Sequence, residues 1–411
     1  MMIALLSIFY LAPFFILSLL YSGQFLILLF GYFLNLVVLI SENSISNNEA
    51  FKYFVIDNLI RATSAILIII SIKSLKDFPL KSLRFNTNFL FSLKKYTFDK
   101  KLIQTFICIQ LVFISFVLIV SPNLSILSFN RDSTISLTIP GIRYIYPFFI
   151  GLSPSLFSCS LLSIISFKKA RLSSLHYILL FVSFINIFLI GQRGFLFTTL
   201  FVAFLTSFLF SFFRLLKGKL NISKLKYWSL IVLSFPIIYN LRSLYNLGKN
   251  KLFTLDLADL QQIKAWEGAI NVTKNLKTTT PPIFNNIFNF LNHQNRIDLG
   301  IQNSSDIVNT FLFSDFYYDK GFGLNITIPM DLYVSFQGDW LWIPTLIIYY
   351  SLIIYGYIQF TKYFLFKKNN LPSYFLITCA FSSLTSGLTG WPLALIFYLE
   401  SELILFIKKK K

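Results

Sequence analysis

Four arginines are the residues whose chemistry best suits a reaction. Arg143, Arg193, Arg242 and Arg296 lie in loops or polar interruptions between apolar segments. A guanidinium group is always charged and binds phosphate through paired hydrogen bonds. Gathered at one membrane surface, these groups could hold a lipid-linked diphosphate and neutralise it as a leaving group without a metal. The alternative for each arginine is that it anchors a helix end.

A proton acceptor could complete such a site. His293, Arg296 and Asp298 form the most polar cluster between residues 242 and 339. A histidine or carboxylate beside a sugar hydroxyl can take up its proton, although a lone histidine is more often structural. The chain lacks GxxxxGK[ST], HExxH, CxxC and Asp-x-Asp motifs. We therefore expect no cofactor and no metal.

Apolar helices must position these residues. Hydrophobic residues make up 55% of the 411-residue chain, and the mean hydropathy is +0.69. The apolar residues form long blocks near the roughly 20 residues that a membrane-spanning helix needs. Alternating segments of about 10 residues, typical of membrane barrels, are absent. The sequence predicts an all-α fold, a polytopic transmembrane bundle of about 11 spans with one large external loop.

The predicted spans divide the chain into three parts. Residues 1–241 hold spans one to eight, residues 242–339 form the external loop, and residues 340–411 hold three spans and a basic tail. The spans are expected at 3–21, 24–41, 54–72, 102–120, 144–167, 173–190, 194–213, 227–241, 340–361, 372–388 and 391–407.

The basic residues predict the orientation of the bundle. If the eleven spans alternate, five Lys and Arg clusters fall on one side, which the positive-inside rule makes cytoplasmic. The net charge of +19 then reflects orientation rather than binding to nucleic acid. Arg193 falls on the outer side, in a tight turn between Gly191 and Gly194 that joins two spans. The clusters lie at 73–101, 168–172, 214–226, 362–371 and 408–411.

Two helices are expected within the external loop. Asp256 is a plausible cap for an amphipathic helix that lies on the membrane, against the spans or on its own loop. Ser304 or Ser305 could cap a short helix that carries Asp306. The chain then returns to the membrane, with Trp340 and Trp342 as interface anchors. The apolar stripe of the first helix consists of Leu257, Leu260, Ile263, Ile270 and Leu276.

Several charges lie inside the predicted spans. Asp57 and Arg61 are four residues apart and share a helix face, so they could pair. An intramembrane charge is also a candidate functional group. Arg61 is therefore a candidate substrate-binding residue, as are Arg296 and Arg143. Glu400 and Glu402 are two residues apart and face different directions.

Two short stretches resemble a known family. The turn Gly191-Gln192-Arg193-Gly194 is similar to the glycine–x–arginine–glycine turn of bacterial O-antigen and capsule repeat-unit polymerases, the Wzy family. The stretch from Asp331 to Gly338, DLYVSFQG, resembles that family's acidic–x–Tyr–x–x–Phe–Gly motif. Here Asp331 stands where glutamate is commoner, and Gln337 separates the phenylalanine from its glycine.

The resemblance implies a glycosyltransferase reaction in the bacterial inner membrane. A growing glycan would pass from its undecaprenyl diphosphate carrier to the next lipid-linked repeat unit, for O-antigen lipopolysaccharide or capsule. Arg193 and Arg242 would hold diphosphates, and Arg296, His293 or Asp331 would position or deprotonate the acceptor hydroxyl. The expected partners are undecaprenyl-diphosphate-linked oligosaccharide and membrane lipids. A protein that regulates chain length is a further candidate partner.

Two other function classes share parts of this pattern. An O-antigen ligase has the same layout but passes the glycan to lipid A–core, and His293 with Arg296 keeps it open. A flippase or transporter would be no enzyme, and transporters often show internal repeats with sites at mid-membrane. No repeat is present, and the polar residues concentrate in the loop.

Overall fold

The structure is a computed structural model and is helical wherever it is described. No strand occurs in the described ranges, which agrees with the expected all-α fold. The described residues are 2–20, 48–71, 100–120, 152–161, 164, 174–190, 262–275, 285, 303–312, 326–368, 370–386 and 391–409.

The described helices include seven long ones, three short ones and a π-helical turn. Residues 152–161 are also helical and are called the serine helix below, because they contain four serines. The elements are α1 (Met2–Leu20), α3 (Asn48–Ser71), α5 (Lys100–Val120), α8 (Ser174–Ile190), α11 (Gln262–Asn275), α13 (Ser304–Leu312), α15 (Ile328–Ser335), α16 (Trp342–Thr361), η5 (Lys362–Lys367), α17 (Leu371–Ser386) and α18 (Trp391–Lys409).

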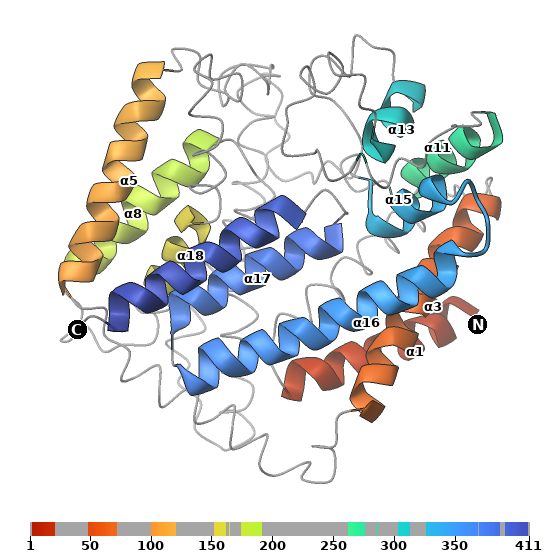
Figure 1. Cartoon of the computed structure of the whole chain (residues 1–411), viewed down its shortest axis with the longest axis horizontal. Helices are drawn as coiled ribbons and strands as arrows, with labels where there is room; N and C mark the ends of the chain where they lie inside the picture. The colour runs from red at the N-terminus through yellow and green to blue at the C-terminus, as the bar shows by residue number, and fades with distance from the viewer. Residues whose placement is uncertain are drawn as a thin grey trace.

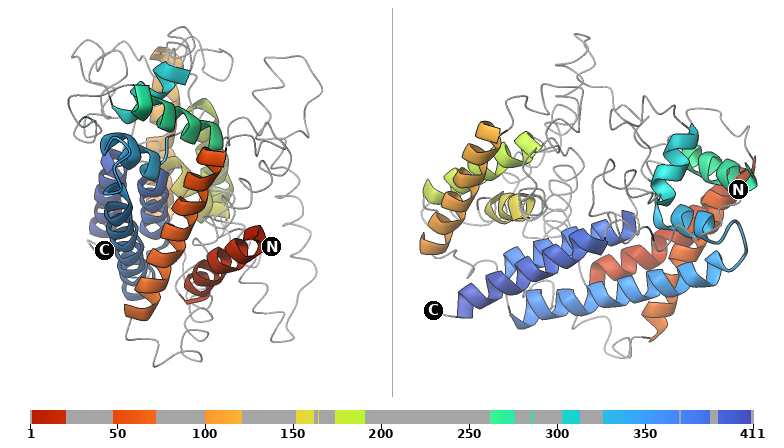
Figure 2. Two further views of the ribbon diagram at one scale, coloured as in Figure 1. Left: turned by 90° about the vertical axis from the view of Figure 1, so that its right-hand side faces the viewer. Right: turned by 45° about the horizontal axis from the view of Figure 1, so that its top comes forward.

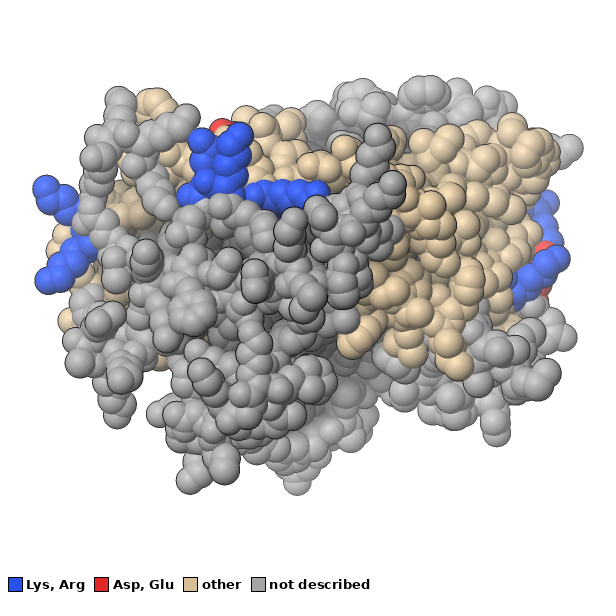
Figure 3. Space-filling model, turned by 90° about the horizontal axis from the view of Figure 1, so that it is seen from below, with Lys and Arg blue, Asp and Glu red and all other residues tan. Residues whose placement is uncertain are grey.

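Two described stretches, Glu49–Ser71 and Trp342–Phe364, are long and apolar enough to cross a membrane. They coincide with the spans expected at 54–72 and 340–361. Large apolar side chains on their outer faces are exposed, for example Ile70 at 70% and Leu352 at 65%. Figure 3 shows a broad uncharged area of described surface, with Lys and Arg at its margins. Apolar exposure on this scale suits a lipid environment better than water.

The elements form a bundle with a layer of short helices at one end. Figure 1 shows α16 running diagonally across the molecule beside α3, with α17 and α18 next to it and α5 and α8 farther away. The short helices α11, α13 and α15, called the short-helix layer, pack together where α3 and α16 begin. In Figure 2 α11 lies across the end of α3.

Small residues let α3 and α16 approach closely. Ala62, Ser64 and Ala65 are fully buried on α3, and the Ser64 hydroxyl contacts the Ile347 carbonyl of α16 at 3.4 Å. Small side chains allow helix backbones to pack closely in apolar surroundings, where hydroxyl–carbonyl bonds add to the association. The pair therefore has a packing interface that requires no charged contact.

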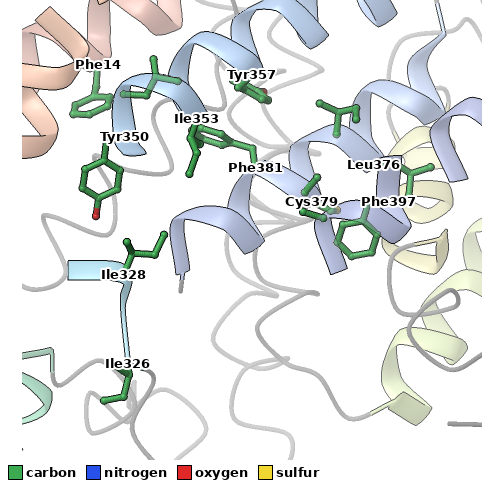
Figure 4. Close-up of a cluster of buried hydrophobic side chains, with 14 of the residues drawn as sticks. Phe14, Ile326, Ile328, Tyr350, Ile353, Tyr357, Leu376, Cys379, Phe381 and Phe397 are labelled. Carbon is green, nitrogen blue, oxygen red and sulfur yellow. The ribbon is translucent and has the colours of Figure 1, made fainter. Parts of the chain in front are cut away.

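The helices α17 and α18 form a hairpin that two serines hold together. Ser373 Oγ donates to the Ser401 carbonyl at 3.0 Å, and Ser401 Oγ lies 3.4 Å from the Ser373 carbonyl. Asn370 begins α17, because its side-chain oxygen accepts from the Ser373 backbone N–H at 3.3 Å. Across to α16, the rings of Tyr357 and Phe381 stack at 4.2 Å, as Figure 4 shows.

The short-helix layer corrects one expectation about helix starts. Helix α13 begins at Ser304, but its cap is Asn303, not Ser304 or Ser305. The Asp306 backbone N–H donates to Asn303 Oδ1 at 2.6 Å, and Asp306 Oδ2 accepts from the Asn303 N–H at 3.4 Å. This reciprocal pair is a capping box with an aspartate in the acceptor position.

Helix α11 was expected to be amphipathic, and its described part packs on both α3 and the rest of the short-helix layer. Residues 256–261, which include the expected cap, lie outside the described residues. Its buried side chains include Ile270 of the expected stripe, together with Ala265, Trp266, Ala269 and Val272. The contact with α13 is made at Gly268, where a Cβ would lie 2.5 Å from Leu312 Cδ1 and 2.9 Å from Val308 Cγ1.

We predict that Gly268→Ala destabilises the protein although alanine favours helices. The propensity gain is about 1 kcal/mol, but overpacking against buried Val308 costs roughly 1–3 kcal/mol. Gly356→Ala is the matched control, because nothing lies within 4 Å of its added Cβ and only the propensity gain remains. Thermal unfolding of purified protein in detergent measures both. Equal midpoints for the two variants would contradict the close α11–α13 contact.

Candidate functional site

The described residues place a carboxyl group at the centre of a buried polar stripe on α15. Thr327, Asp331 and Ser335 are four residues apart in turn, and side chains at this spacing share a helix face. All three are buried, and Asp331 is 0% exposed. Among the described residues, the hydroxyls of Thr327 and Ser335 have no hydrogen-bond partner. A buried hydroxyl without a partner is costly, so these two groups are available to a polar ligand.

The sequence makes α15 short and fixes both of its ends. Thr327 has extended backbone angles, Pro329 lies in the first turn, and the Asp331 N–H donates to the Thr327 carbonyl at 3.0 Å. Proline suits a first turn, because the N–H that it lacks would have no helical partner there. Asp331 thus lies in the first turn, where a negative charge is favoured by the helix dipole.

The far end of α15 is a Schellman turn. The Gly338 N–H donates to the Tyr333 carbonyl at 2.9 Å, and the Gln337 N–H donates to the Val334 carbonyl at 3.1 Å. Gln337 has φ 53° and Gly338 has φ 79°, so both adopt the left-handed backbone that ends such helices. The extra residue between Phe336 and Gly338 thus occupies a position that glycine usually fills.

Four aromatic rings fasten this helix to the bundle. The rings make six pairs with centroid separations from 4.8 to 6.1 Å. The Tyr333 hydroxyl donates to the Tyr53 hydroxyl at 3.3 Å, and the Trp266 indole N–H has no partner. We call this the aromatic cluster; its members are Tyr53 on α3, Trp266 on α11, Tyr333 on α15 and Trp342 on α16.

The predicted Asp57–Arg61 pair is confirmed. Arg61 Nε and Nη2 donate to the two carboxylate oxygens of Asp57 at 3.0 and 2.8 Å. The Tyr350 hydroxyl donates to Asp57 at 3.3 Å, and the guanidinium carbon lies 5.2 Å from the Tyr350 ring centroid. The side chain of Asp57 is 2% exposed and that of Arg61 is 12% exposed. The guanidinium of Arg61 is therefore already engaged by protein groups.

The structure separates the two predicted site residues that it describes. These residues are Asp331 and Arg61. Asp331 lies on α15, which Tyr53 of α3 contacts through Tyr333. Arg61 lies eight residues, or about 12 Å, farther along α3 than Tyr53. Arg61 thus belongs to the helix interior, and a role in substrate binding stays a prediction. The other predicted site residues lie outside the described residues: Arg143, Arg193, Arg242, His293 and Arg296.

Sequence reasoning missed three residues of this region. Thr327 and Ser335 flank Asp331 at helical spacing, a signal that was readable once the stretch was taken as a helix. Trp266 gave no comparable signal, because its partners are distant in the chain. In the described part, no three His, Cys, Asp or Glu side chains are grouped so that they could hold a metal ion.

Comparison of the chain with protein-family models, with curated proteins and with solved structures found no match. The site must therefore be interpreted from its own chemistry. A buried carboxyl flanked by two free hydroxyls can accept a proton from a ligand hydroxyl and hydrogen-bond its neighbours. None of these three side chains carries a positive charge that would bind an anion.

We predict that Gly338→Ala destabilises the end of α15. Alanine in a left-handed conformation costs about 1–2 kcal/mol, and its Cβ would lie 3.2 Å from the Tyr333 hydroxyl. Gln337→Asn is the matched variant one residue away, because asparagine keeps the amide and tolerates positive φ. Thermal unfolding in detergent should show a loss for the first and no loss for the second. A similar loss in both would show that the Gln337 side chain, not the backbone, matters.

We predict strong coupling between Asp57 and Arg61. Removing one partner of a buried ion pair costs roughly 3–5 kcal/mol, because the other charge stays buried. Asp57→Asn and Arg61→Gln should each lower the unfolding temperature markedly, and the double variant should recover much of the loss. Additive losses in the double-mutant cycle would show that the two side chains act independently.

Proposed function

We propose that the protein is a polymerase that joins undecaprenyl-diphosphate-linked oligosaccharide repeat units into a surface polysaccharide. It would act as a multi-pass protein at the outer face of the bacterial cytoplasmic membrane. The observation that carries the proposal is the buried polar stripe around Asp331, in the short-helix layer where α3 and α16 begin. This stripe supplies the proton acceptor that such a transfer needs.

The distribution of charge along the described helices supports this orientation. Tyr53 near the start of α3 and Trp342 at the start of α16 lie side by side, so both helices run away from the short-helix layer. Lys362 and Lys367 follow α16, about 30 Å from its start. The end of α18, with Lys408 and Lys409, lies near the start of α17, because Ser373 pairs with Ser401. The positive-inside rule places these lysines in the cytoplasm and the short-helix layer outside.

The proposed reaction divides its work between two sets of residues. Asp331 takes the proton of the acceptor sugar hydroxyl, and the hydroxyl oxygen forms a bond to the anomeric carbon of the donor glycan. The bond between that carbon and the diphosphate breaks, and the carrier diphosphate leaves with the electron pair. Arg193 and Arg242 would neutralise the leaving group, and His293 or Arg296 would position the acceptor. Since Asp331 is enclosed in this structure, α15 or a covering segment must move to admit the acceptor.

We predict that Asp331→Asn abolishes polymer formation and that Asp306→Asn does not. Both residues are buried aspartates of the short-helix layer, but Asp306 serves the capping box, which asparagine can also satisfy. The variants would be expressed in a strain that lacks the chromosomal copy, and surface polysaccharide would be resolved on gels as a ladder of lengths. Asp331→Asn should leave single repeat units, and Arg193→Ala should do the same with normal membrane insertion.

Four outcomes would contradict the proposal. Normal ladders from Asp331→Asn would remove the proposed proton acceptor, and normal ladders from Arg193→Ala would remove the proposed diphosphate site. Long lipid-linked polymer that fails to reach lipid A–core, in a strain without the protein, would instead identify a ligase. Repeat units retained on the cytoplasmic side would identify a flippase.

A further inference from the structure

A second buried carboxyl lies far from the polar stripe, within the α17–α18 hairpin. Glu400 of α18 is 1% exposed, and neither of its carboxylate oxygens has a hydrogen-bond partner among the described residues. Glu402, two residues farther on, is partly exposed, as the expected difference in direction requires. A carboxylate buried without a donor or counter-charge is strongly disfavoured. The carboxylic acid, which is neutral, does not carry this cost.

Three described helices of the bundle offer Glu400 no positive charge. Helices α16 and α17 and the serine helix have no Lys, Arg or His. The titratable group with which Glu400 interacts is the Cys379 thiol of α17, and Cys379 in turn interacts with Cys159 of the serine helix. Figure 4 shows Cys379 beside Phe397, which lies one turn before Glu400 on α18. An ionised Glu400 would therefore find no compensating group in this packing.

Glu400 is also dispensable for the contact between its two helices. The hairpin is already joined by the reciprocal Ser373–Ser401 bonds and by apolar packing around Phe397. An apolar residue would fill the position of Glu400 without the cost of burying a carboxyl. Packing alone thus gives no reason for an acid here. Carboxyls retained inside membrane bundles commonly serve proton or ion pathways.

Polar side chains join the serine helix to α17 on one side and to α5 and α8 on the other, and we call this series of groups the polar path. All four serines of the serine helix are buried. The Ser155 hydroxyl is hydrogen-bonded to the Cys379 thiol, on the side of α17 and α18. On the opposite face, Ser153 donates to the Gln110 side-chain oxygen at 2.8 Å, and the Asn186 amide also donates to Gln110.

Several buried hydrogen-bonding atoms on α5, α8 and the serine helix lack a partner in the described part of the chain. Besides the two oxygens of Glu400, Gln110 Nε2, Ser160 Oγ, Ser183 Oγ and Asn186 Oδ1 are buried without a partner. These groups lie on four helices of the described part, and donors and acceptors are both present. Such atoms are expected where water or an exchanging proton passes through an otherwise apolar interior.

We propose that Glu400 is a proton-binding site inside the helical bundle, protonated in the packed state and reached through the polar path of the serine helix. The ligand is a proton rather than a metal cation, because the described part holds no group of three His, Cys, Asp or Glu side chains, and one carboxyl alone cannot replace the hydration shell of a cation. This inference does not depend on the proposed polymerase activity.

Infrared spectroscopy of the purified protein in detergent tests the proposal. A protonated carboxyl has a carbonyl stretch that is distinct from the bands of a carboxylate and of an amide side chain. At neutral pH the band should be present in the wild type and in Glu402→Gln and lost in Glu400→Gln. It should shift in heavy water and disappear reversibly as the pH is raised. Circular dichroism confirms that the variants keep their helical content.

Each alternative outcome overturns the proposal. Identical wild-type and Glu400→Gln spectra at neutral pH would show that Glu400 is ionised. A band that neither shifts in heavy water nor responds to pH would show a trapped proton without a path. Loss of the band on addition of sodium at constant pH would assign the site to a metal cation. None of these results depends on polysaccharide synthesis, so the two proposals fail separately.

Discussion

The contact on which the rest of the structure depends is the aromatic cluster. Its four rings come from four helices, and every ring contacts the other three. Each such pair is worth about 0.5–1.5 kcal/mol beyond the area that it buries. The exposed Lys274–Glu49 bridge, at 2.6 Å between α11 and α3, adds little by comparison. Aromatic packing therefore sets the position of the short-helix layer, and with it the position of Asp331.

The same layer shows why the polar stripe can exist. Tyr333 and Asp331 are two residues apart on one short helix, so they lie on different sides of α15. Fastening Tyr333 to Tyr53 and Trp342 fixes the rotation of α15 about its axis, and the stripe of Asp331 is then held in a defined direction. The Schellman turn ends α15 immediately after Ser335, which keeps the helix short. A longer or differently rotated helix would place an apolar residue where the carboxyl now lies.

The bundle contains two buried acids whose surroundings differ in kind. Asp57 is compensated fully, by two bonds from Arg61 and one from Tyr350. Glu400 accepts no hydrogen bond from any described residue. The first arrangement is stable as an ion pair and needs nothing from outside. The second is tolerated only if the carboxyl carries a proton, so the two acids differ in their expected charge and not merely in place.

The sequence predicted the features that depend on local spacing. Apolar length located α3 and α16, and the four-residue spacing of Asp57 and Arg61 predicted their pair. The cap of α13 was misplaced by one or two residues, because Asn303, Ser304 and Ser305 are all good caps and only the packed backbone selects among them. The aromatic cluster was not predictable, since residues 53, 266, 333 and 342 are brought together by tertiary contacts. The roles of the arginines at 143, 193, 242 and 296 and of His293 stay predictions, because these residues lie outside the described part of the chain.

Gln337 illustrates how far a local departure can be interpreted. Relative to the motif that the stretch resembles, this residue lengthens the step from phenylalanine to glycine, which in a strand or an extended loop would shift every later residue by one position. At a Schellman end the extra residue takes the left-handed position itself, and Gly338 follows with positive φ. The cost is about 1–2 kcal/mol of backbone strain, and α15 ends directly after Ser335. With Gln337 in this position, Asp331 lies in the first turn of α15 and Tyr333 contacts both Tyr53 and Trp342.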